Sequence, residues 1–489
     1  MRISVFLFFF NLLATVSFAQ QGYELKFQVT GLKDTTVYLG NYYGETTYVK
    51  DTARVNSKGE FVFDGKKALN YQGVYFLVMQ DEKKNNQKLP FEIVIGANQH
   101  FSMVTSTDDY VKNMKVTGDI DNKIFFENMI FNGERHLEAE PYMKVIQDST
   151  LTEDKKKSAR EAFSKINEKV VKYQTEMIAK YPNTITAKIL KGNLAITIPE
   201  APKKADGTVD STFQLRWYRE HFFDNFDLAS QALICLPRPL YRDKVFEYLD
   251  KLYVPQADTL TKAINKIVAK AKSNPETYKY MVWVILLKYQ QPEIMGLDEV
   301  YVNVFDKYFA SGEMNFWVND KLMKNLKDHA DRLRKSLVGR KAPNLIMQDA
   351  NFKARSMYDI KNKYTVLFIF DPDCGHCREE TPKLVSFYDA KKFDLEVYAV
   401  SLDTSMAKMR DYIKEMKMKW VTVNGPRTYV GPCQDLYDAM QTPSVYVIDD
   451  KKKIIAKKVP VEKLGDFLTQ YERFEKQAAG QKPKAPAKL

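Results

Sequence analysis

The sequence of 489 residues predicts a multidomain chain: an all-β sandwich or barrel, then an α-helical domain, then an α/β domain. Short apolar–polar alternations separated by turn residues run to about residue 118. Helical periodicity follows over residues 119–337, and strands alternate with helices over 338–475. Because domains usually hold about 100–200 residues, the length fits this division. An apolar share of 45% is enough for several cores.

The charge pattern and the cysteine count exclude two classes of protein. The chain carries 74 basic and 62 acidic residues, a net charge of +12, but the two signs are mixed along it. A nucleic-acid-binding protein would gather its basic residues on one element, so no nucleic acid is expected as a partner. Four cysteines in this length are too few for a small disulfide-stapled scaffold.

Residues 1–19 have the pattern of a secretory signal peptide. Arg2 precedes an apolar core over residues 3–14, and Ser17-Phe18-Ala19 supplies the small residues of a cleavage site. The core is too short to span a bilayer of about 30 Å. We therefore expect an exported mature protein beginning near Gln20, without stable membrane insertion, in a compartment where disulfides persist.

Residues 20–118 are expected to form a β-sandwich-like domain. Apolar and polar residues alternate in short runs, and turn residues such as those over 56–59 separate them. We find no catalytic constellation here, and His100 stands alone. The expected strands lie at 25–29, 37–39, 46–49, 60–63, 74–78, 91–95 and 101–104.

Residues 119–337 are expected to form an α-helical domain. Apolar residues recur at helical spacing in several amphipathic segments, and prolines fall between these segments. The histidines His136, His221 and His329 are too far apart for a His-x-x-x-His metal pair. Cys235, between Ile and Leu, is expected to be a buried thiol.

From residue 338 the pattern indicates a central sheet covered on both faces. The run 364–370 is continuously apolar, which is typical of a strand buried on both sides. Helical patterns lie between and after the strands. The Gly-, Pro-, Ala- and Lys-rich segment 476–489 is expected to be a disordered basic tail. Further strands are expected at 395–401, 419–423, 444–448 and 454–459, and a last helix at 461–474.

The most informative stretch is Cys374-Gly375-His376-Cys377, directly after the first buried strand and at the start of a helix. A helix N-terminus stabilises a thiolate, and a thiolate attacks disulfides. Cys374 is therefore the candidate nucleophile, and Cys377, one turn further on, would resolve the mixed disulfide. His376 can hydrogen-bond or, when charged, favour the thiolate. The pattern predicts a redox-active disulfide between Cys374 and Cys377.

Other uses of two cysteines fit less well. A structural disulfide that closes so short a loop restrains the unfolded chain little. A c-type haem site needs histidine after the second cysteine, where Arg378 stands. A zinc or copper site needs more ligands, and no histidine follows His376. We therefore expect neither a metal nor a cofactor.

The stretch from about residue 338 to 474 resembles the thioredoxin superfamily, in particular the TlpA/ResA-like exported thiol–disulfide oxidoreductases. Pro382, five residues after the second cysteine, matches the proline that kinks the active-site helix. Thr442-Pro443 matches the cis-proline that faces the cysteine pair and supplies backbone contacts to substrate. Glu380 matches the acid that tunes the cysteines in this group. The Cys-Gly-His-Cys tetrapeptide itself is that of protein disulfide isomerases.

Two departures refine the resemblance. Phe368 stands where plain thioredoxins carry a buried aspartate, so Glu380 is the better candidate for proton transfer. Asp371 stands where peroxiredoxins carry a threonine, three residues before the reactive cysteine. The upstream regions resemble modules that precede such domains in exported Bacteroidota proteins, which implies a periplasmic location.

Together these observations predict a periplasmic thiol–disulfide oxidoreductase acting on protein thiols and disulfides, with a membrane electron donor or a periplasmic client as partner. Two alternatives remain: an AhpC/TSA-like thiol peroxidase, or a binding protein whose cysteine pair is a redox-sensitive clasp. Cys433, expected near the active-site end of the sheet, is either an incidental thiol or a disulfide relay.

Overall fold

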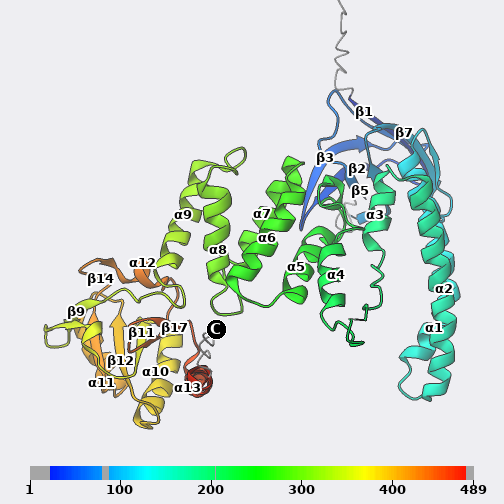
Figure 1. Ribbon diagram of the computed structural model, residues 1–489. Helices are drawn as coiled ribbons and strands as arrows, with labels where there is room; N and C mark the ends of the chain where they lie inside the picture. Colours follow the sequence, from blue (N-terminus) through cyan, green and yellow to red (C-terminus); the bar gives the residue numbers. More distant parts are fainter. Residues whose placement is uncertain (1–21, 80–86, 204, 481–489) are drawn as a thin grey trace, which may run out of the picture. The chain divides into compact units, whose positions relative to one another are not determined.

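The computed structural model describes residues 22–79, 87–203 and 205–480 (Figure 1). They form two compact units: the described residues within 22–252 together with 267–281, and those within 253–266 together with 282–480. Strand-rich sheets, a helical region and an α/β domain follow one another along the chain, which confirms the predicted fold class. The predicted signal peptide lies outside the described residues. Within the described ranges, no helix combines the length and apolar character needed to cross a membrane.

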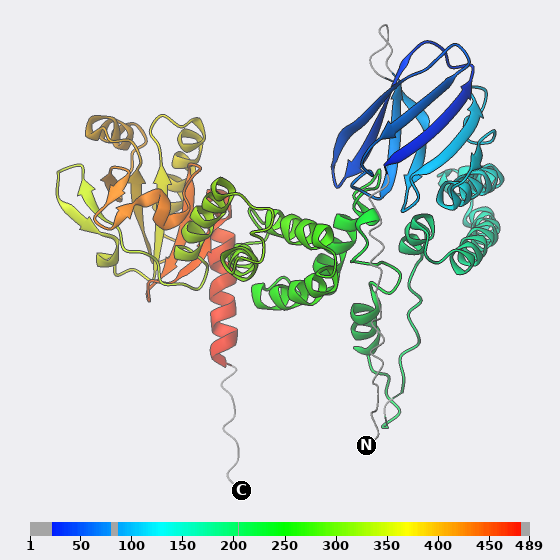
Figure 2. The same cartoon turned by 90° about the horizontal axis from the view of Figure 1, so that it is seen from above.

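The first strands form a sandwich of two four-stranded sheets (Figure 2), ordered β4-β1-β7-β8 and β3-β2-β5-β6. Along β1 (Tyr23–Thr30) every second side chain is buried, as period-two alternation predicts. Phe27 of one sheet and Leu77 of the other belong to the same core. The remaining strands are β2 (Thr36–Tyr43), β3 (Thr46–Arg54), β4 (Glu60–Gly65), β5 (Gly73–Met79), β6 (Gln87–Ile95), β7 (His100–Ser106) and β8 (Lys115–Thr117).

The helical region begins with a hairpin of two long helices, α1 (Ile120–Gln147) and α2 (Glu153–Lys180), which lie side by side (Figure 1). Asp119 caps α1, because its carboxylate accepts a hydrogen bond from the backbone N–H of Asn122. Shorter helices follow: α3 (Ile185–Asn193), α4 (Phe213–His221), α5 (Leu240–Leu252), α6 (Ala257–Ala271), α7 (Pro275–Lys288), α8 (Asp298–Val304) and α9 (Asp320–Lys335), with a 3-10 turn η1 (Gln231–Leu233) and a π-helix η2 (Phe305–Ala310) that continues α8.

The C-terminal domain has a seven-stranded sheet ordered β10-β9-β13-β12-β11-β16-β17. The central strand β11 (Tyr364–Phe370) runs parallel to β12 (Leu395–Ser401) and antiparallel to β16 (Ser444–Asp449). The other strands are β9 (Ile346–Asp349), β10 (Ala354–Ser356), β13 (Val421–Asn424) and β17 (Ile454–Lys457), beside the two-stranded β14 (Arg427–Thr428) and β15 (Gly431–Pro432). The helices are η3 (Met357–Asp359), α10 (Gly375–Asp389), α11 (Met406–Glu415), α12 (Cys433–Tyr437), η4 (Val461–Lys463) and α13 (Leu464–Gly480).

The apolar run of β11 divides between two cores, one on each face of the sheet. Val366 and Phe368 belong to one core, whereas Leu367 and Ile369 belong to the other. Because successive side chains point to opposite faces, a strand covered on both sides needs an apolar residue at every position.

The structure differs from the sequence expectations mainly at the edges of this domain. The expected strands do not include β9 and β10, which extend the sheet beyond β13. The helix α13 continues to Gly480, so the first residues of the expected disordered tail are helical. Residues 481–489 lie outside the described residues.

Candidate active site

The loops of the candidate site meet at one edge of the sheet. The parallel strands β11, β12 and β13 all end there, and the antiparallel β16 begins there. The segments that follow β11 and β12 and the segment that precedes β16 are therefore neighbours. They carry Cys374, Asp403 and Thr442-Pro443.

Cys374 is the N-cap residue of α10. Its extended backbone (φ −81°, ψ 122°) turns the chain into the helix, and its Sγ accepts a hydrogen bond of 3.4 Å from the backbone N–H of Cys377. N-terminal N–H groups lack partners inside a helix, so the sulfur takes the role that serine or aspartate usually fills. The predicted position at a helix start is therefore present in the structure.

The predicted cis-proline faces the same sulfur. The Thr442–Pro443 peptide bond is cis. The Cys374 thiol donates a hydrogen bond of 3.4 Å to the backbone carbonyl of Thr442. The structure thus brings Cys374, Cys377 and Thr442-Pro443 together from segments that are distant in the chain.

The two thiols differ in acidity. Partial burial raises the pKa of Cys374, but hydrogen bonds at Thr442 and Cys377 and to the backbone of His376 outweigh it, so the pKa lies below its ordinary value. Burial raises the pKa of Cys377 to about 12. Both are free thiols in this structure. Cys374 is therefore the sulfur that ionises first, as the sequence predicts for a nucleophile.

The side chains of the other two predicted residues on α10 lie close to charged groups of the same helix. His376 is 83% exposed, and its Nδ1 is 3.5 Å from a carboxylate oxygen of Glu379. Glu380 binds the amino group of Lys383 at 2.5 Å. The carboxylate of Glu380 is thus held by a lysine. Its role in proton transfer stays a prediction.

A buried polar pair behind Cys377 was not expected from the sequence. Thr381 bonds the carbonyl of Cys377 at 2.7 Å and the hydroxyl of Tyr412 at 2.8 Å. The Tyr412 ring stacks on Phe370, and burial raises the pKa of its hydroxyl to about 12. Tyr412 lies on α11, and no spacing in the sequence connects it with the cysteine pair.

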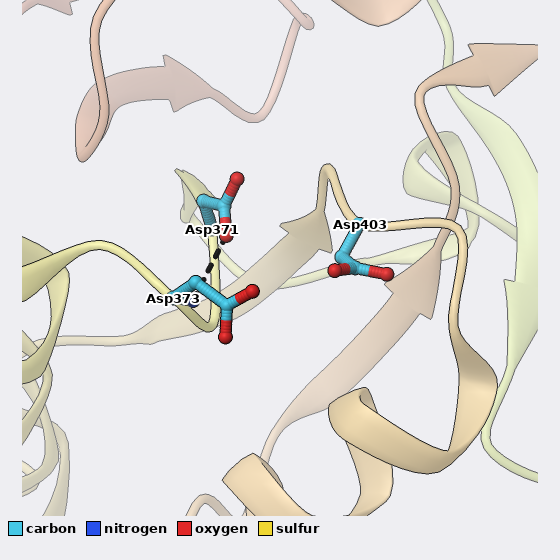
Figure 3. Close-up of side chains that lie close together, drawn as sticks. All are labelled: Asp371, Asp373 and Asp403. Carbon is cyan, nitrogen blue, oxygen red and sulfur yellow. Dashed lines mark hydrogen bonds between the residues drawn. The ribbon is translucent and has the colours of Figure 1, made fainter.

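Three aspartates form a cluster that includes two residues of the Cys374 loop. Asp371 and Asp373 follow β11, and Asp403 follows β12 (Figure 3). One carboxylate oxygen from each lies within 4.8 Å of the others. The amino group of Lys408 binds Asp373 at 2.6 Å and Asp403 at 3.0 Å. Lys408 thus offsets part of the negative charge of this cluster, and it links the Cys374 loop to the end of β12.

The remaining cysteines are buried. Cys433 begins α12, as expected, and is fully inaccessible; burial raises its pKa to about 12. Cys235 is also fully buried, and burial raises its pKa to about 12. Cys377 is equally buried, but it is hydrogen-bonded to Cys374, whereas burial is the sole cause of the raised pKa of Cys433; this difference favours the incidental interpretation of Cys433 over a disulfide relay.

One family model covers the part of the chain that carries the cysteine pair. The AhpC/TSA family matches residues 338–457. A thiol-disulfide oxidoreductase ResA of Bacillus cereus is 24% identical over 125 residues, which is 25% of this chain and 70% of that protein. ResA of Bacillus subtilis is 25% identical over 118 residues, 24% of this chain and 64% of that protein. Residues 338–457 form a TlpA/ResA-like domain of the thioredoxin family. Its class of chemistry is that of the thiol–disulfide oxidoreductases.

Solved structures similar to this TlpA/ResA-like protein include a domain of a possible thiol-disulfide isomerase from Cytophaga hutchinsonii, 39% identical, covering 29% of this chain and 97% of that one, with a TM-score of 0.27. A thioredoxin-like protein from Bacteroides caccae is 19% identical and covers 57% of this chain and 100% of that one, with a TM-score of 0.44. Residues 23–125 and 149–330 match two domains of unknown function, DUF4369 and DUF5106.

Proposed function

We propose that this protein is an exported enzyme that exchanges disulfides with protein substrates through the Cys374-Gly-His-Cys377 pair. The observation that carries the proposal is the asymmetry of the pair. Cys374 caps a helix, faces the Thr442 carbonyl and has a lowered pKa, whereas the buried Cys377 stays protonated. A pair of this kind holds one sulfur ready to attack and one ready to resolve.

In the reducing direction, the Cys374 thiolate attacks one sulfur of a client disulfide, and the second client sulfur leaves as a thiolate. Cys377 then loses its proton and attacks Cys374 Sγ. The Cys374–Cys377 disulfide forms, the client's first sulfur leaves, and two electrons have passed to the client. The reverse sequence oxidises a client dithiol. A reducing cycle requires a donor that restores the dithiol, for which a membrane electron donor is the proposed partner.

The proposed location is the periplasm. It rests on the signal-peptide pattern of residues 1–19 and on the exported proteins that the C-terminal domain resembles. An oxidising compartment supplies disulfide-bonded clients.

A thiol peroxidase is the second candidate, because the matching family is AhpC/TSA. In that case peroxide would oxidise Cys374 to a sulfenic acid, which Cys377 would condense to a disulfide with loss of water. Asp371 opposes this alternative, because an acid stands where a peroxidase needs a hydroxyl donor. Turnover of hydrogen peroxide by the purified protein with a thiol reductant would promote it. Full partner binding by a Cys374/Cys377 double serine variant would instead favour a redox-sensitive clasp.

The decisive experiment traps the mixed disulfide. In Cys377→Ser the second step is blocked, so client proteins should remain bound to Cys374 and appear as adducts on a non-reducing gel of cells that express the variant. The Cys374→Ser/Cys377→Ser variant is the matched control and should carry no adducts. Equal adducts in both, or none in either, would contradict the proposed function.

A further inference from the structure

A cavity of about 840 Å³ lies next to the cis-proline segment. It is enclosed by the α7–α8 loop, by α9, by the segment that follows α12 and by the chain from β17 into α13, all within the second compact unit. Its volume is within the range of about 300–1,000 Å³ that sites for drug-sized ligands occupy. Several residues of a peptide fit such a space.

The cavity lining ends one residue before the cis-proline segment of the candidate active site. Met440 and Gln441 line it, and the next residue, Thr442, accepts the hydrogen bond from Cys374. Consecutive Cα atoms are about 3.8 Å apart, so an extended chain needs roughly two to four residues to pass from the Cys374 sulfur into the cavity. A client cysteine at Cys374 would therefore deliver its neighbours to this space.

The exposed side chains that line the cavity include apolar ones, and the charged ones among them are equal in number for the two signs. Ile294 is 49% exposed and Met440 is 60% exposed, and Met295 is also exposed. Methionine side chains adapt to different partners, which suits a surface that accepts more than one sequence. The exposed charged residues around them balance in sign: Glu293 and Asp466 are acidic, and Lys458 and Lys463 are basic.

The walls are held by buried polar contacts. Lys457 and Asp298, whose side chains are 5% and 7% exposed, form an ion pair of 2.6 Å. The backbone N–H of Lys457 also donates to Met295 Sδ at 3.2 Å, which holds the α7–α8 loop beside β17. Asp438 lies 2.8 Å from the amino group of Lys458 and 3.6 Å from Arg332 of α9. The cavity is thus a formed site on fixed elements.

We propose that this cavity is the subsite for client residues that flank the reactive cysteine, and that it selects an extended, uncharged polypeptide segment with apolar side chains. The inference rests on the proposed function, because it assumes a protein client at Cys374. It adds that residues of the α7–α8 loop, outside the thioredoxin-like domain, determine which clients bind. Two observations support this occupant over a small charged thiol: Gln441 of the lining directly precedes Thr442, and Ile294, Met295 and Met440 are exposed.

The test measures binding without redox chemistry. The full chain carrying Cys374→Ser/Cys377→Ser is titrated with fluorescein-labelled ten-residue peptides that have a central serine and either leucines or serines at the flanking positions. Fluorescence anisotropy should give about tenfold tighter binding for the leucine peptide. This is the gain expected when two leucine side chains each become about half buried. Ile294→Ser/Met295→Ser, in the same background, should lose this preference.

Ile346→Ser is the matched control, because Ile346 is 43% exposed and does not line the cavity. It should keep the preference. Equal affinity for both peptides, or equal loss in the variant and the control, would overturn the subsite.

A separate assay keeps the two proposals distinguishable. The reaction of the wild-type pair with a small aromatic disulfide tests the chemistry alone, because such a substrate has no flanking residues to place in the cavity. Absence of that reaction in the wild type would count against the proposed function, whereas a normal reaction together with equal affinity for the two peptides would overturn the subsite alone.

Discussion

Selective alkylation of Cys374 is the most quantitative consequence of the site geometry. The pKa of Cys377 is raised to about 12, three units above the ordinary 9.0, and the pKa of Cys374 lies below 9.0. Each unit is a tenfold change in the thiolate fraction, so at pH 7 the Cys374 thiolate is at least about 1,000-fold more populated.

The rate difference is smaller than the population difference. A thiolate of lower pKa is a weaker nucleophile, with a Brønsted slope of about 0.4–0.5, so three units cost roughly 20-fold in intrinsic reactivity. The expected net preference for Cys374 is therefore about 50-fold or more, and the complete burial of Cys377 adds to it.

The assay is iodoacetamide alkylation of the reduced protein at pH values from 5 to 10, followed by mass spectrometry of the two cysteine peptides. Because the lowered pKa favours the thiolate, the Cys374 rate should rise with pH and level off at a midpoint below 9. Cys377 should stay unmodified over this range. Equal rates, earlier modification of Cys377, or a Cys374 midpoint at or above 9 would refute the assignment of nucleophile and resolving sulfur.

Three further predictions concern the surroundings of the pair. Asp298→Ala leaves the buried ammonium of Lys457 without its partner and should lower the free energy of unfolding by about 3–5 kcal/mol in urea titrations. Asp298→Leu combined with Lys457→Met should recover most of this loss. No recovery would contradict the buried-pair explanation. Tyr412→Phe removes a buried hydrogen bond to Thr381 and should cost about 1 kcal/mol in the same titration, whereas an unchanged midpoint would place this hydroxyl outside the core. Cys433→Ala should change the rate of disulfide exchange less than twofold, and a large loss would restore the disulfide-relay interpretation.

Much of the C-terminal fold could be predicted because the strands are buried on both faces. Tyr364–Phe370 and Leu395–Ser401 have the bounds that their apolar runs indicate. Burial of both faces leaves few polar positions inside such a strand, here Thr365 and Glu396, so its ends are visible in the sequence. β10 (Ala354–Ser356) has no fully buried residue, and its short sequence is no different from a loop.

The cysteine pair could be predicted for a different reason. Its chemistry depends on a short spacing and on the start of a helix, which are both local features. The contact between Cys374 and Thr442 could be expected only through resemblance to a family. The pair of Thr381 and Tyr412 and the cavity beside Met440 arise from packing between elements that are distant in the chain, which no local pattern encodes.

The most direct test of the central claim is a redox titration of the full chain in buffers of reduced and oxidised dithiothreitol, with mass spectrometry of the alkylated protein. Oxidation of the Cys374–Cys377 pair should be a single reversible two-electron transition, in which the equilibrium constant changes tenfold for about 30 mV. The peptides that contain Cys235 and Cys433 should stay reduced throughout. Oxidation that leaves Cys374 and Cys377 as thiols, or that joins Cys374 to another cysteine, would contradict the proposed redox pair.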